Sequence, residues 1–132
     1  MSVYPDLQEL ADRLKKLPIV TPSALPSLVY GYVRTAEPAP DYADACSDLL
    51  TWWTASCGWQ LGVVFRDVGV GCGRAVGPGF TGLLDVLHLP KVAYAVVVTT
   101  QLGRKPKDAA RLTAEIHRTG ATLRVLADEV RP

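Results

Sequence analysis

Three charged side chains stand just after apolar segments that have the composition of buried strands. They are Arg34, Asp67 and Arg104. In an α/β domain the carboxyl ends of parallel strands meet at one edge of the sheet, so these side chains are expected to converge there. Two arginines at one edge could hold a phosphate or another oxyanion through their forked donors. Asp67 could orient one arginine, or it could form a structural Arg–Asp pair that steadies the loop. The same edge is expected to collect Thr99, Thr100 and Gln101.

A glycine-rich loop follows Asp67, with Gly69, Gly71 and Gly73 at alternate positions and Arg74 after them. A dinucleotide site needs G-x-G-x-x-G that opens a helix directly, and here the next helix is expected only several residues later. A P-loop ends in G-K-[ST], and this loop contains no lysine. We therefore interpret the segment as a flexible loop.

Metal catalysis and nucleophilic catalysis have little support. His88 and His117 are the two histidines, both on expected helices at surface or helix-end positions, without the cysteine or carboxylate spacing of a metal site. No serine or cysteine stands in a recognisable nucleophile elbow. Cys46 and Cys57 fall about 16 Å apart on one expected helix, so we interpret them as reduced core residues. We expect no metal and no cofactor.

Apolar periodicity divides the chain into alternating helices and strands. We expect a buried strand over 61–65 that ends in Arg66-Asp67, and a central strand over 92–99 that is covered on both faces. Alternation of this kind indicates a three-layer α/β sandwich with a mostly parallel central sheet. Further strands are expected over 28–34 and 121–127, and helices over 5–17, from Asp41 to Gly58, over 80–89 and from Pro106 to Gly120.

The first helix is amphipathic. Its apolar stripe comprises Leu7, Leu10, Ala11, Leu14 and Leu17. We expect this helix to pack back on the domain, the alternative being an arm that docks on a second copy or a partner. Residues 1–26 then form an N-terminal helix with a proline-containing connector, and residues 27–132 form the main domain.

Composition bounds the class of protein. The chain has 132 residues, 48% of them hydrophobic and 20% charged, which suits one globular domain. A net charge of +1 predicts no strong field for nucleic acid, although residues 104–107 form a local basic cluster. No apolar run approaches the length of a membrane helix, so we expect a cytoplasmic protein without membrane contact.

Three segments, in order, resemble the catalytic domain of the serine recombinases, the resolvase/invertase group. Tyr32-Val33-Arg34-Thr35-Ala36 resembles Y-x-R-x-S. Residues 67–71, followed by Gly77-Pro78-Gly79-Phe80, resemble D-x-x-x-G…R-P-G-F, and residues 96–104 resemble an apolar strand that runs into D-R-L-x-R. The likeness extends from residue 30 to about 126 and implies a resolvase-like sheet with flavodoxin-like winding.

The resemblance implies a serine that attacks a DNA phosphodiester, with arginines that stabilise the transition state. Loss of one preorganised donor can raise a barrier by about 2.7–4 kcal/mol, so loss of several donors and the nucleophile should abolish cleavage. Arg34, Asp67 and Arg104 match family site positions, whereas Ala36 stands at the serine, Gly77 at the arginine before Pro-Gly-Phe, and Thr100-Gln101 at the Asp-Arg pair. We also expect the family's long dimer helix and DNA-binding domain to be absent, since the sequence ends at Pro132.

These departures favour a catalytically inactive domain that acts as a protein-interaction or regulatory module, as a homo-oligomer or with another protein. A second hypothesis is a small-anion or nucleotide sensor. A third is an accessory to DNA recombination that binds DNA weakly, or only beside an active partner. The candidate anion-binding residues are Arg34, Gly69, Gly71, Gly73, Arg74 and Arg104.

Overall fold

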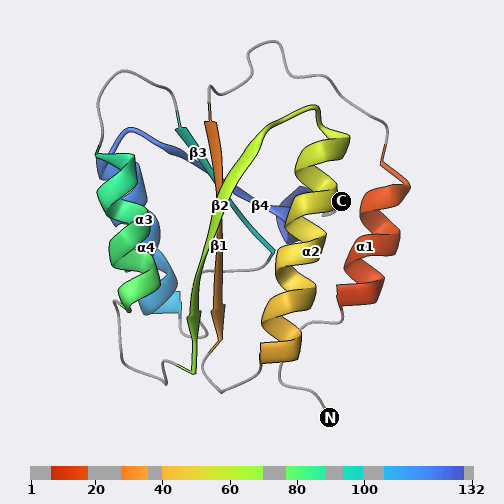
Figure 1. Cartoon of the computed structure of the whole chain (residues 1–132), viewed down its shortest axis with the longest axis horizontal. Helices are drawn as coiled ribbons and strands as arrows, with labels where there is room; N and C mark the ends of the chain where they lie inside the picture. The colour runs from red at the N-terminus through yellow and green to blue at the C-terminus, as the bar shows by residue number, and fades with distance from the viewer. Residues whose placement is uncertain are drawn as a thin grey trace.

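The computed structural model describes residues 7–17, 28–35, 40–69, 77–88, 94–99 and 106–129 (Figure 1). Helices and strands alternate along most of this chain, as the apolar periodicity predicts. The helices are α1 (Leu7–Lys15), α2 (Pro40–Ser56), α3 (Pro78–Leu87), α4 (Pro106–Arg118) and α5 (Leu126–Glu129). The strands are β1 (Leu28–Thr35), β2 (Leu61–Val68), β3 (Tyr94–Val98) and β4 (Thr122–Val125).

The four strands form one parallel sheet in the order β2-β1-β3-β4. The expected parallel α/β fold is therefore confirmed. In the register of β1 and β2, Arg34 lies beside Asp67 and Thr35 beside Val68. The two charged residues thus meet at the carboxyl end of the sheet, as the sequence predicts.

Helices cover both faces of the sheet. Helices α1 and α2 lie on one face, and α3 and α4 lie on the other (Figure 1). Because side chains alternate along a strand, Val29 and Val33 of β1 pack in the core with α1, α2 and α5, whereas Tyr30 and Tyr32 pack in the core with α3 and α4. Strand β3 alternates in the same way, with Ala95 and Val97 in the first core and Val96 and Val98 in the second.

Helix α1 packs back on the domain, as expected from its apolar stripe. Leu10 and Leu14 are 7% and 4% exposed and belong to the same core as α2 and α5. Its polar face turns outward and carries an Arg13–Glu9 ion pair of 2.9 Å between exposed side chains.

The expectation of a buried strand over 61–65 is wrong. Strand β2 extends to Val68 and lies at an edge of the sheet, where β1 is its one neighbour among the described strands. Val63 is accordingly 54% exposed. An apolar run alone does not distinguish a central strand from an edge strand, because strand order is set by packing of the whole domain. Asp67 therefore lies inside a strand and not after one.

The last strand is shorter than expected. Strand β4 ends at Val125, and the next four residues form α5 instead of continuing the strand and a polar tail. Leu126, at the start of α5, is fully buried in the core that α1 and α2 share. The expected helix beginning at Asp41 starts one residue earlier, at Pro40. In the described part of the chain no helix is both long and apolar enough to cross a membrane.

Candidate functional site

The carboxylate of Asp67 is the centre of the candidate site. It lies inside β2 with 3% of the residue exposed. The backbone N–H groups of Gly79 and Phe80 donate to its two oxygens, at 2.7 and 2.8 Å. The hydroxyl of Tyr32 donates a third hydrogen bond, at 2.6 Å. Three donors around one buried carboxylate satisfy most of its acceptor positions and fix its orientation.

This carboxylate caps the N-terminal end of α3. Pro78 stands at the start of the helix, where its missing N–H costs nothing, and the next two amides point at Asp67. The first amides of a helix have no intrahelical partner and favour a negative charge. Gly77, the N-cap residue of α3, has no side chain that could cap the helix. The Asp67 carboxylate, from the neighbouring strand β2, supplies the negative charge instead.

Two glycines allow this close approach. A Cβ on Gly77 would lie 2.5 Å from one Asp67 oxygen, and a Cβ on Gly79 would overlap the backbone carbonyl oxygen of Arg66. Real Cβ atoms almost never show such contacts. A side chain at position 77 therefore requires the Asp67 carboxylate, or the start of α3, to move.

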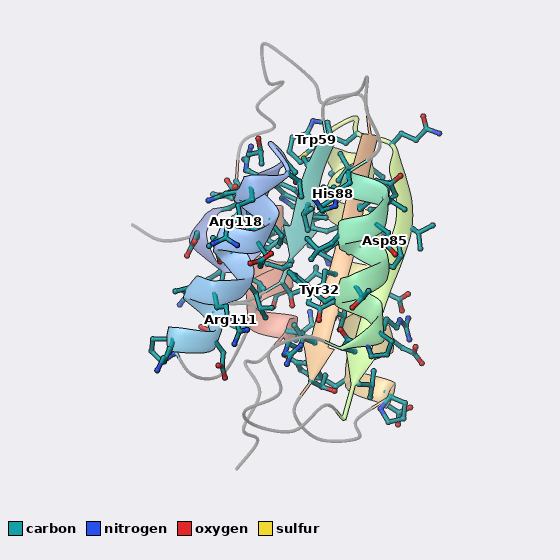
Figure 2. All side chains as sticks on the ribbon, turned by 90° about the vertical axis from the view of Figure 1, so that its left-hand side faces the viewer. Tyr32, Trp59, Asp85, His88, Arg111 and Arg118 are labelled. Atoms are coloured by element: carbon teal, nitrogen blue, oxygen red, sulfur yellow. The ribbon has the colours of Figure 1, made fainter. Side chains whose placement is uncertain are left out.

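Tyr32 joins Asp67 to Arg34. The Nη1 atom of Arg34 donates to the Tyr32 hydroxyl at 3.2 Å, and that hydroxyl donates to Asp67. Tyr32 is 1% exposed and packs edge-on against Phe80, with ring centroids 5.4 Å apart, between the sheet and α3 (Figure 2). Burial first, and then the hydrogen bond to Asp67, raise the pKa of Tyr32 above its ordinary range. The phenol is thus held neutral.

The Tyr32 hydroxyl gives folding a dependence on alkaline pH. Its pKa in the folded chain lies above the value of about 10 for an unfolded chain, so its contribution to stability is full below that pH and is lost as the pH rises further. We expect the free energy of unfolding, from urea titrations above about pH 9, to fall more steeply in the natural chain than in Tyr32→Phe. All other titratable groups are the same in the two proteins, so parallel curves would contradict the assignment to Tyr32.

The structure refines the predicted relation between Arg34 and Asp67. The sequence interpretations paired Asp67 with one of the two arginines without specifying which, and the structure connects it to Arg34 through Tyr32. Arg34 is half-buried at the end of β1. Tyr32 could have been found from the sequence, because residues i and i+2 of a strand share one face and Tyr32 precedes Arg34 by two.

Other predicted site positions have structural roles or lie elsewhere. The Gly69 amide donates to the carbonyl oxygen of Thr35 at 3.0 Å and closes the end of the β1–β2 pair, with a φ of +74°. Thr99 is buried, and its hydroxyl contacts the Cys46 sulfur at 3.6 Å, in the core. Ala36, Gly71, Gly73, Arg74, Thr100, Gln101 and Arg104 lie outside the described residues.

The histidines and cysteines take the expected positions. His88 caps the C-terminal end of α3 and His117 lies in the last turn of α4, both exposed. Cys46 is buried and Cys57 half-buried, and both are free thiols. Burial raises the pKa of both thiols. Among the described residues, no three histidine, cysteine or carboxylate side chains come together as metal ligands would.

Solved structures of two other proteins have a similar fold. The N-terminal catalytic domain of TP901-1 integrase has a TM-score of 0.64 and 19% identity, over 77% of this chain and 79% of that one. The C-terminal catalytic domain of ISC1926 TnpA, an IS607-like serine recombinase, has a TM-score of 0.58 and 16% identity, over 75% and 69% of the two chains. This chain has a resolvase-like α/β fold.

At these identities the likeness establishes the fold alone. No protein-family model matches the sequence, and no curated protein does. The serine-recombinase-like fold places Arg34, Tyr32 and Asp67 at the carboxyl edge of the sheet, where α/β domains carry their functional groups. A shared fold does not establish a shared activity, so the function of this edge must be inferred from the residues that form it in this chain.

Proposed function

We propose that the chain is a catalytically inactive serine-recombinase-like domain that acts as a protein-interaction or regulatory module and associates with itself. The resolvase-like fold supports the ancestry. The sequence supports the inactivity, because Ala36 stands where the resemblance places a serine, and alanine has no hydroxyl to attack a phosphate. A recombinase-like domain without a nucleophile still presents the outer faces of its helices to partners.

The observation that carries this proposal is the position of the Asp67 carboxylate against the first amides of α3. Gly77 stands where the resemblance places an arginine, and a Cβ at that position would lie 2.5 Å from the Asp67 carboxylate. The amides of Gly79 and Phe80 and the Tyr32 hydroxyl already occupy that carboxylate. The local packing of this chain is thus fitted to glycine at position 77, and a larger side chain there requires the Asp67 carboxylate or the start of α3 to move.

The test is cleavage of supercoiled plasmid DNA. We expect neither nicking nor a covalent protein–DNA adduct from the natural chain, since a phosphoryl transfer without metal needs a nucleophile and several cationic donors. The variant Ala36→Ser regains a hydroxyl and is expected to stay inactive, because Gly77, Thr100 and Gln101 still lack the matching groups. Nicking by the natural chain would overturn the proposal. Nicking by Ala36→Ser alone would show that the remaining site is intact.

The anion-sensor hypothesis receives less support from the described residues. A helix N-terminus is the usual seat for a bound phosphate, and here two amides of α3 are taken by Asp67. Arg34 contributes one of its donors to Tyr32. We therefore keep the inactive interaction module as the proposed function.

A further inference from the structure

Helix α4 carries a row of exposed cations on its outer side. Lys107, Arg111, Ala114 and Arg118 are exposed and follow one another at intervals of four, three and four residues, which places them on one ridge of the helix. We call this set the basic ridge. Figure 2, which looks onto the side of α3 and α4, shows Arg111 and Arg118 along α4.

Helix α2 carries a ridge of the opposite sign. Asp41, Ala45, Asp48 and Trp52 are exposed and are separated by the same intervals of four, three and four residues. We call this set the acidic ridge. The helix contains three aspartates and no lysine or arginine. Trp52, at its end, is a large aromatic residue left 37% exposed.

The two ridges are complementary when they run antiparallel. In that register Asp41 faces Arg118, Ala45 faces Ala114, Asp48 faces Arg111 and Trp52 faces Lys107. The alanines at matched positions leave room for two helices to approach closely. The Nζ atom of Lys15 already lies 5.8 Å from the centre of the Trp52 ring, which shows that the ring accepts a cation, and Lys107 of the second copy shares the ring with Lys15 or displaces it.

Most of the ridge charges form no ion pair with another described residue. The ion pairs among the described residues involve neither Asp41 nor Asp48, and neither Lys107 nor Arg111. Arg118 is the exception: it pairs with Glu115 at 2.6 Å, yet its side chain is 72% exposed. The acids of α4, Asp108 and Glu115, lie off the ridge and are less exposed.

The ridges cannot meet within one molecule. Helix α2 covers one face of the sheet and α4 the other, so the sheet separates them (Figure 1). We propose that the basic ridge of one copy docks antiparallel on the acidic ridge of a second copy, in a head-to-tail arrangement. This inference rests on the proposed self-association and names its surface. When two copies pair in this way, one keeps its acidic ridge free and the other keeps its basic ridge free. Further copies can therefore add, and the contact propagates to a ring or an open chain.

The expected contact is weak and sensitive to salt. Exposed ion pairs contribute about 0.2–1 kcal/mol each and are screened over about 10 Å at 0.1 M salt. Sedimentation velocity at low salt should therefore show a weight-average mass that rises with protein concentration and falls when salt is added. A monomer at every concentration in low salt would overturn the proposal.

Charge reversal at the central pair, Asp48 and Arg111, gives the decisive test. We expect Asp48→Arg or Arg111→Asp alone to weaken association about tenfold, since each replaces attraction by repulsion. The double variant Asp48→Arg/Arg111→Asp restores the pair with the signs exchanged and is expected to associate again. Asp85→Arg makes the same change in net charge as Asp48→Arg but lies on α3, outside both ridges, and is the matched control for that variant. Failure of the double variant to recover, or an equal loss in the control, would overturn the proposal.

Nucleic acid is the competing partner for a basic ridge. Fluorescence anisotropy with duplex DNA distinguishes the two, because Arg111→Asp would then weaken DNA binding while Asp48→Arg left self-association unchanged. That pair of results would overturn the second copy as occupant. The plasmid assay is independent of these measurements. If the chain nicks DNA and the double variant still recovers association, the proposal of catalytic inactivity is refuted and the proposed interface stands.

Discussion

Replacing Asp67 with alanine is expected to lower the free energy of unfolding by about 3–5 kcal/mol, because it leaves several buried donors without an acceptor. The Tyr32 hydroxyl and the amides of Gly79 and Phe80 all donate to this one carboxylate. The substitution also removes the negative charge that faces the start of α3. Urea denaturation followed by circular dichroism measures the loss.

Asp44 provides the matched control for this substitution. Its carboxylate accepts from Arg66 at 2.6 Å, but the Asp44 side chain is 63% exposed, so Asp44→Ala should cost less than about 1 kcal/mol. Asp67→Asn keeps the shape of the side chain and should lie between the two. If Asp67→Ala and Asp44→Ala cost the same, the carboxylate does not anchor α3.

Gly79→Ala should have the second-largest effect, about 3 kcal/mol, because the added methyl group meets backbone and not a movable side chain. Its Cβ would overlap the carbonyl oxygen of Arg66 and lie 2.7 Å from the carbonyl carbon and 3.0 Å from an Asp67 oxygen. Relief requires α3 to move away from β2, which lengthens the hydrogen bonds to Asp67. The same urea titration measures the change.

Gly82→Ala, in the same helix, is the control. Its Cβ would lie 3.2 Å from a ring atom of Phe65, a side chain that can give way. Alanine is favoured over glycine inside a helix by about 0.5–1 kcal/mol, so the net change should be small. A loss at position 82 as large as that at position 79 would mean that α3 does not rest on the β2 backbone.

The sequence suffices for the types of the elements before α5 and for the meeting of Arg34 with Asp67. Periods of 3.6 and 2 residues mark helices and strands because each element must bury one face, and parallel strands bring their carboxyl ends together. The motif series from Tyr32 to Arg104 indicated the resolvase-like fold, which the two solved structures share. Gly58 and Gly120, the last residues of two expected helices, follow α2 and α4 with φ of +76° and +88°, the left-handed conformation that commonly ends a helix.

The tertiary structure alone decided the order of the strands and the partners of Asp67. An apolar run has the same composition in a central strand and in an edge strand. For that reason β2 was expected to be buried, whereas the structure places it at the edge of the sheet. The short α5 depends on the pocket that receives Leu126, which α1 and α2 help to form. Asp67 takes donors from residues 35 positions before it and 12 and 13 positions after it. Periodicity describes neighbours along one element, whereas such a network depends on how separate elements pack.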